Sequence, residues 1–186
     1  MWRLTPIAEC GQPTEDLEQI AGTLCRTSNA LPNFIKLLAR SRPSLIAYAR
    51  AEEALANGAL TTAQRERIAL AVAEINGCDY CIAAHLQYGK RAGLSDTEMQ
   101  AALKATANDH KTETMLHFVQ ALVLQRGEVG DEDFSVMRKA GFSEAEIIEV
   151  LANVVLNIFT NYFNILARTE LDGSPSQSNP ITQPAR

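Results

Sequence analysis

One short stretch of the sequence, residues 78–85, contains two thiols and an imidazole at helical spacing. In a helix, residues at i, i+3 and i+7 share a face, so Cys78, Cys81 and His85 are expected to project to one side. His85 follows Cys81 by one turn, and helical side chains lean toward the N-terminus, which predicts its ring close to that sulfur. Cys78 lies about 10 Å from His85 along the axis, too far for direct contact. A thiol beside a base, with a second thiol that can close onto it, is what dithiol redox chemistry requires.

A reactive thiol must lose its proton, and two features compete to activate one member of the pair. The helix N-terminus would stabilise a thiolate at Cys78 by only ~1 kcal/mol. His85 would instead take the proton of Cys81 directly. We therefore favour Cys81 as the attacking thiol. Glu66 and Glu74, on the preceding predicted helix, are the candidates to orient the imidazole or to hold water in a proton relay.

The cysteine pair is also compatible with a metal site or with simple burial. A zinc site needs a fourth ligand, and the sequence contains no second Cys/His cluster with zinc-ligand spacing. Free cysteine is often buried as a small apolar side chain. Cys10 and Cys25 have no nearby partners in the sequence. We expect redox chemistry at Cys78 and Cys81, with no metal and no other cofactor.

Composition narrows the class of protein. The 186 residues carry a formal charge of −5 and no Lys/Arg-rich run, which argues against nucleic acid as a partner. The N-terminus lacks the apolar core of a signal peptide. The longest apolar stretch, residues 147–167, is interrupted by Glu149 and four asparagines, which argues against a membrane span. These observations predict a cytoplasmic protein, and in that reducing compartment a close cysteine pair suits catalysis better than a structural disulfide.

Helix-forming residues dominate the chain, and no sustained alternation of period two predicts a strand. The expected fold is all-α, a compact helical bundle. We divide it into an N-terminal helical extension (1–29), whose short helix begins near Thr14, a main helical domain (30–171), and a Pro-, Ser- and Gln-rich tail (172–186) expected to be disordered. Thr61 and Gln64 form a capping-box pattern that opens the helix before the cysteines.

An internal repeat supports the bundle. Residues 92–98 recur in similar form at 140–146, each with a Gly stop, an apolar residue, a Ser cap and a Glu three positions later. This pattern predicts a duplicated helical hairpin, of which only the first copy carries cysteines. Two copies are too few for a solenoid, so a compact arrangement is expected.

The last predicted helix, residues 144–168, carries a polar stripe on an otherwise apolar sequence. Two interpretations remain open. Its amides could pair between packed helices or subunits, or they could line a substrate pocket. Apolar residues of the same helix could supply a subunit interface. The stripe consists of Asn153, Asn157, Asn161 and Asn164, and the candidate interface residues are Ile158, Phe159, Tyr162 and Phe163.

Residues 60–70 and 73–81, followed by His85, resemble the carboxymuconolactone decarboxylase superfamily, and more narrowly its alkylhydroperoxidase D (AhpD-like) peroxidase branch. The similarity covers roughly residues 30–170, and its spacing of Glu, CxxC and His is specific. The resemblance implies an all-α fold assembled as trimers or hexamers. It also implies a hydroperoxide substrate and an external dithiol reductant, such as a lipoyl or thioredoxin-like protein.

The resemblance further assigns roles to individual residues. It implies that Cys81 is peroxidatic, that Cys78 resolves the sulfenic acid as a disulfide, and that His85 and Glu66 form the proton relay. One departure is Tyr80, where some members carry a histidine. A phenol titrates at about pH 10 and does not replace an imidazole as a base, although it donates a hydrogen bond.

The sequence therefore predicts a thiol-dependent peroxidase, with Glu74 and Tyr80 in supporting positions. Two rival functions stay open on the same scaffold. The first is a redox sensor or disulfide-relay protein whose cysteines cycle without peroxide turnover. The second is a cofactorless decarboxylase or isomerase, which would leave Cys78 and Cys81 without a role.

Overall fold

The computed structural model describes residues 3–6 and 31–173, and within these ranges the chain forms helices and no strand. The all-α prediction is confirmed for this part of the chain. The predicted helix near Thr14, Cys10, Cys25 and residues 174–186 lie outside the described residues. The helices in chain order are α2 (Asn33–Leu38), α3 (Arg42–Ala56), α4 (Thr62–Asn76), α5 (Asp79–Arg91), α6 (Asp96–Leu103), α7 (His110–Leu124), α8 (Asp131–Lys139) and α9 (Glu144–Ala167).

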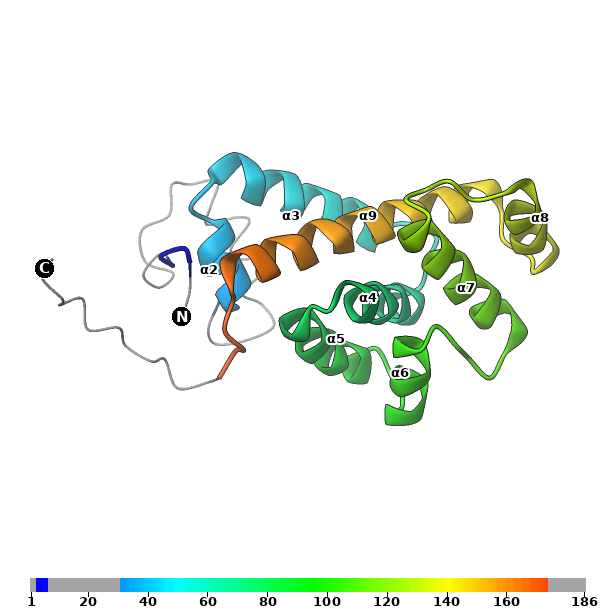
Figure 1. Ribbon diagram of the computed structural model, residues 1–186, viewed down its shortest axis with the longest axis horizontal. Helices are drawn as coiled ribbons and strands as arrows, with labels where there is room; N and C mark the ends of the chain where they lie inside the picture. The colour runs from blue at the N-terminus through cyan, green and yellow to red at the C-terminus, as the bar shows by residue number, and fades with distance from the viewer. Residues whose placement is uncertain (1–2, 7–30, 174–186) are drawn as a thin grey trace, which may run out of the picture.

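Helix α4 is the centre of the bundle. It packs against α5, α6, α7 and α9, and its six consecutive residues 68–73 are all buried. A helix that is apolar on every side is stable only when neighbours surround it. Figure 1 shows α9 running along the molecule, with α3 beside it and the group α4 to α7 on its other side. Helix α4, which precedes the cysteines in the sequence, is therefore buried by several neighbouring helices.

Helix α9 is long and apolar enough to cross a membrane by length and composition alone, which is true of no other helix in the described ranges. The core helix of a globular bundle passes the same test. Here α9 packs along α4, α7 and α3, and its Val150 and Val154 are almost completely buried. Its apolar character is therefore explained in part by the core that it forms.

The predicted helix starts are confirmed by their hydrogen bonds. The backbone N–H of Gln64 donates to Thr61 Oγ1 at 3.2 Å, and the Thr61 N–H donates to Gln64 Oε1 at 2.8 Å. The same reciprocal pattern joins Ser95 with Glu98 and Ser143 with Glu146.

The repeated joints also share their backbone geometry. Gly93 and Gly141 both adopt φ of +87°, a left-handed conformation that glycine tolerates at a helix C-terminus. The following residues, Leu94 and Phe142, are buried in the same main core. The structure thus confirms the duplicated hairpin, α5–α6 and α8–α9.

A second, smaller apolar cluster surrounds the start of α5. It brings α2 and α3 against the cysteines, and the rings of Phe34 and Tyr48 meet edge to face with centroids 5.0 Å apart. Phe163 of α9 contacts the same Phe34 ring at 5.6 Å. Four elements therefore converge on the cysteine motif. The buried members are Leu31, Phe34, Ile35, Leu38, Leu45, Ala73, Cys78, Tyr80 and Cys81.

Candidate active site

The two cysteines of the motif are joined as a disulfide and are both buried, with 2% of Cys78 and 3% of Cys81 exposed. Cys78 is the N-cap residue of α5 rather than part of its first turn, because Gly77 ends α4 in a left-handed conformation and α5 begins at Asp79. The backbone N–H of Cys81 donates to Cys78 Sγ at 3.4 Å. The N-terminus of α5 therefore provides a hydrogen-bond donor to the sulfur of Cys78, the thiol that the helix-dipole argument favoured.

The sulfur of Cys81 has a different partner. Asn164 of α9 donates from Nδ2 to Cys81 Sγ at 3.4 Å, and only 4% of this asparagine is exposed. Its Oδ1 is buried and has no hydrogen-bond partner among the residues that the structure describes. A side-chain amide fixed in this position offers a hydrogen-bond donor to whatever charge develops on the sulfur.

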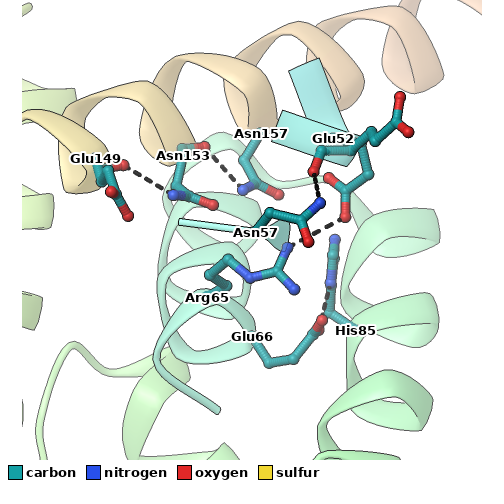
Figure 2. Close-up of polar contacts among 9 residues, drawn as sticks. Glu52, Asn57, Arg65, Glu66, His85, Glu149, Asn153 and Asn157 are labelled. Carbon is teal, nitrogen blue, oxygen red and sulfur yellow. Dashed lines mark hydrogen bonds and ion pairs between the residues drawn. The ribbon is translucent and has the colours of Figure 1, made fainter. Parts of the chain in front are cut away.

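The asparagine stripe of α9 divides between the two interpretations left open above. Asn153 and Asn157 donate to main-chain oxygens of their own helix, four residues earlier, as Figure 2 shows. Asn161 accepts from Asn76 Nδ2 of α4 at 3.0 Å. Asn164 lines the cavity described below. Sequence reasoning identified the stripe but not the contact of Asn164 with Cys81, since that contact joins elements 83 residues apart.

A carboxylate and an imidazole pair beside the cysteines. His85 Nδ1 and Glu66 Oε2 lie 2.8 Å apart, with 21% and 14% of the two side chains exposed. Figure 2 shows the two side chains pointing toward one another from α5 and α4. Because a carboxylate only accepts hydrogen bonds, this contact favours the proton on Nδ1 and leaves Nε2 to exchange a proton with a ligand.

The sequence predicted the His85 ring close to the Cys81 sulfur, within reach of its proton. No hydrogen bond joins the imidazole to either sulfur in the part of the chain that the structure describes; the ring binds Glu66, and the Cys81 sulfur accepts from Asn164. Cys81 and His85 nevertheless line one cavity. A ligand of sufficient size in that cavity can therefore contact both side chains.

This cavity has a volume of about 670 Å³, which suits an organic ligand. Cys81 is part of its lining, whereas Cys78 is not among the described residues that form it. The two cysteines therefore differ in whether they border the cavity that a ligand could enter. The lining residues are Pro32, Phe34, Ile35, Tyr48, Ala49, Arg50, Glu52, Glu53, Ala56, Asn57, Glu66, Tyr80, Cys81, Ala84, His85, Tyr88, Arg91, Thr160 and Asn164.

Tyr80 lines the cavity but is held by its hydroxyl group. The hydroxyl donates to Asp172 Oδ2 at 2.7 Å and accepts from the backbone N–H of Phe34 at 3.2 Å, and Asn33 N–H donates to Asp172 Oδ1 at 2.7 Å. Burial above all, with the Asp172 carboxylate adding to it, raises the pKa of Tyr80 well above its ordinary value. Tyr80 therefore stays a neutral hydrogen-bonding group.

Two predictions need correction at this point. Asp172, assigned to the disordered tail, accepts hydrogen bonds from the Tyr80 hydroxyl and the Asn33 N–H, because its carboxylate satisfies two donors of the packed domain.

Glu74 does not join Glu66 at the site. It is exposed and absent from the cavity lining, since eight residues of helix separate the two carboxylates by about 12 Å.

The described residues contain no group of three or more His, Cys, Asp and Glu side chains that could hold a metal ion. The carboxylates Glu52, Glu53 and Glu66 of the cavity lining are paired with nitrogen groups instead. Beside the Glu66–His85 pair, Arg65 contacts Glu52 at 3.4 Å (Figure 2), and Arg50 contacts Glu53 at 2.9 Å.

Residues 44–123 match the carboxymuconolactone decarboxylase family. Among curated proteins, the chain is 32% identical over 87 residues to the alkyl hydroperoxide reductase AhpD of Bradyrhizobium sp. strain BTAi1, a match that covers 47% of this chain. It covers 48% of that relative, so the chain spans about half the length of the curated protein it matches.

Two solved structures share the fold of the described residues. An uncharacterized peroxidase-related protein with an alkylhydroperoxidase AhpD core, from Ralstonia eutropha JMP134, superposes with a TM-score of 0.82 at 21% identity, covering 91% of this chain and 92% of that one. A cysteine-to-alanine variant of the debrominase Bmp8, in complex with 2,3,4-tribromopyrrole, gives a TM-score of 0.79 at 19% identity and covers 92% of each chain. The superposed structures show that the chain has the AhpD-like fold, and its segment 44–123, which contains the CxxC motif, matches the carboxymuconolactone decarboxylase family.

Proposed function

We propose that this protein is a thiol-dependent peroxidase that reduces organic hydroperoxides through a dithiol–disulfide cycle of Cys78 and Cys81. The observation that carries the proposal is the cavity in which Cys81 lies together with the Glu66–His85 pair, while Cys78 lies outside the lining. The match to an alkyl hydroperoxide reductase AhpD supports the same activity.

In the first step, the thiolate of Cys81 attacks the terminal oxygen of a hydroperoxide bound in the cavity. The O–O bond breaks, the sulfur becomes a sulfenic acid, and the departing alkoxide takes a proton to form an alcohol. His85 Nε2 is the group to remove the thiol proton beforehand and return it to the alkoxide, with Glu66 holding Nδ1. Asn164 Nδ2 stabilises the charge on the sulfur.

In the second step, the thiol of Cys78 attacks the sulfenic sulfur and releases water, which yields the disulfide. The Cα atoms are 5.3 Å apart, within the usual range for a disulfide, so the backbone already accommodates the bond. An external dithiol then reduces the pair and is itself oxidised. We propose a lipoyl or thioredoxin-like protein for this role, since both carry two exchangeable thiols.

The test is peroxide consumption by the reduced protein, with thiols counted in parallel. Wild type is expected to consume cumene hydroperoxide with loss of two thiols per turnover. Cys81→Ser should lose turnover completely. Cys78→Ser should react once and retain a sulfenic acid, which dimedone labels.

Cys25→Ser is the matched control, because this cysteine lies outside the motif and should leave turnover unchanged. Undiminished turnover by Cys81→Ser would refute the assignment of the attacking thiol. Thiol oxidation without peroxide turnover, together with a protein captured as a mixed disulfide by Cys78→Ser, would favour the redox-sensor function instead. Activity on a lactone or carboxylic acid that survives alkylation of both thiols would favour a decarboxylase or isomerase.

A second candidate function is thiol-dependent reductive dehalogenation of an aromatic compound. The observation that favours it is the aromatic wall of the cavity, Phe34, Tyr48 and Tyr88, beside Cys81, in a fold shared with a debrominase. Two thiols would supply two electrons, replacing bromine by hydrogen and releasing bromide and a proton as the disulfide forms. Release of bromide from a bromopyrrole by the reduced protein, and its loss in Cys81→Ser, is the measurement.

A further inference from the structure

The cavity face of α5 continues beyond the cysteine and histidine. Cys81, His85, Tyr88 and Arg91 follow one another at spacings of four, three and three residues, so they share one helical face, and all four line the cavity. The rings of His85 and Tyr88 have centroids 5.7 Å apart, and the Arg91 guanidinium carbon lies 5.9 Å from the Tyr88 centroid. One helix thus presents a sulfur, a base, an aromatic ring and a cation in order.

Arg91 differs from the other charged residues of the cavity. The carboxylates of the lining already have partners: Glu66 pairs with the His85 imidazole, and Glu52 and Glu53 pair with Arg65 and Arg50. Among the residues that the structure describes, no carboxylate lies within ion-pair distance of Arg91, whose guanidinium contacts the Tyr88 ring instead.

The cavity that Cys81 and Arg91 line also has an aromatic component. Phe34, Tyr48 and Tyr88 are part of its lining. Burial above all raises the pKa of Tyr88, and the neighbouring carboxylates Asp172 and Glu66 raise it further, so its phenol is neutral around pH 7. Cys81 and Arg91 are ten residues apart, which corresponds to about 15 Å of helix.

We infer that the preferred substrates are amphiphilic hydroperoxides with a carboxylate remote from the peroxide group, and that Arg91 binds this carboxylate. The inference rests on the proposed peroxidase function and names the class of substrate for it. Such a molecule places its peroxide at Cys81 and His85, its apolar chain along Tyr88 and its carboxylate at Arg91. An arginine held against an aromatic ring presents its N–H groups in a fixed fork that matches a carboxylate.

The experiment compares one hydroperoxide with and without the negative charge. The hydroperoxide of linoleic acid and that of its methyl ester have the same chain, and the ratio of their kcat/KM values isolates the contribution of the carboxylate. In Arg91→Gln this ratio should fall by about tenfold, as expected for loss of a charge-assisted hydrogen bond. Arg91→Lys should retain part of the preference, because the charge remains but the fork is lost.

Lys90→Gln is the matched control. Lys90 is the adjacent cation of the same helix, pairs with Asp96 at 3.1 Å and does not belong to the described cavity lining. The substitution removes the same charge without reaching the ligand, so the acid-to-ester ratio should be that of wild type. A ratio near one in wild type, or a ratio equally lowered by both variants, overturns the inference and leaves the peroxidase function standing.

A binding measurement separates this inference from the proposed function. Titration calorimetry of laurate into the oxidised protein needs no turnover. Laurate should bind about tenfold more weakly to Arg91→Gln than to Lys90→Gln. If wild type consumes neither peroxide, the proposed function fails, and the calorimetry alone decides on the carboxylate site. Equal affinities in the two variants would then refute it.

Discussion

Asn164 links the asparagine stripe to the chemistry of the cysteine pair. Its amide donates to Cys81 Sγ from a position that is 4% exposed, where water competes little with the contact. A donor to the charged form of a thiol favours that form. We expect Asn164→Leu to slow alkylation of the Cys81 thiol near neutral pH by about tenfold, because the thiolate loses a hydrogen-bond donor.

The measurement is the pH dependence of iodoacetamide alkylation in a Cys78→Ser background. Asn157→Leu is the control, because Asn157 lies on the same helix and its amide donates to a main-chain oxygen of α9. Identical alkylation profiles for the two variants would contradict a role of Asn164 at the sulfur.

Glu66 and Glu74 provide a second comparison at the scale of single residues. Both belong to α4, yet only Glu66 contacts His85 and lines the cavity. A group that orients a general base is expected to matter for proton transfer, so Glu66→Gln should lower kcat/KM on the order of a hundredfold. Glu74→Gln should leave it unchanged. Measuring kcat/KM for peroxide consumption under matched conditions tests both variants. Equal losses of kcat/KM in the two variants would argue that α4 contributes negative charge rather than a specific contact with His85.

At the scale of the helices, the Ser–Glu caps at the repeated joints make the free energy of unfolding depend on pH. Glu146 accepts from the backbone N–H of Ser143 at 2.7 Å, and this hydrogen bond lowers the pKa of Glu146 below 4.5. A lowered folded-state pKa means that the stabilisation is fully present above the unfolded value. It is lost as the pH falls through the folded value.

Glu146→Gln should therefore flatten the fall of the unfolding free energy between about pH 5 and pH 3, because glutamine does not titrate. Urea unfolding at a series of pH values measures this. Glu144→Gln is the control, since Glu144 is an exposed residue of the same first turn and pairs with Arg138 instead of capping the helix. A pH profile for Glu146→Gln that matches wild type would show that the cap does not contribute in its charged form.

At the scale of the whole molecule, α9 leaves an apolar seam exposed. Its members are spaced three, four, four, three and four residues apart, the pattern of a helix that packs against another helix. Contiguous apolar surface of this kind marks interaction sites in soluble proteins. Of the interface residues expected from the sequence, Ile158 and Phe163 pack inward instead. The exposed seam is Ile148, Leu151, Val155, Phe159, Tyr162 and Leu166.

We propose that this seam joins copies of the chain, in line with the trimers or hexamers that the family resemblance implies. Val155→Glu with Tyr162→Glu should then lower the molecular mass in solution, because burying two carboxylates at an apolar contact is costly. Sedimentation velocity measures the mass. Leu124→Glu, at an exposed position of α7, is the control. A monomeric wild type at micromolar concentration would contradict the proposal.

Features that depend on neighbours within one helical turn were predictable from the amino-acid sequence. The caps at Thr61, Ser95 and Ser143 and the left-handed stops at Gly93 and Gly141 were all predictable, because each depends on contacts between residues three to five positions apart. The all-α class followed from the same local preferences. The pairing of Glu66 with His85 was expected from the family resemblance, which carries spatial information that composition and periodicity lack.

Which groups meet at the cysteines follows from the packing of helices that are distant in the sequence. Asn164 reaches Cys81 across 83 residues and Asp172 reaches Tyr80 across 92, and periodicity within one helix does not report on such contacts. Access to the cavity, which separates Cys81 from Cys78, likewise depends on how α3 and α9 pack around α5. The physical reason is that backbone hydrogen bonding and capping are local, whereas a cavity is formed by side chains that only packing brings together.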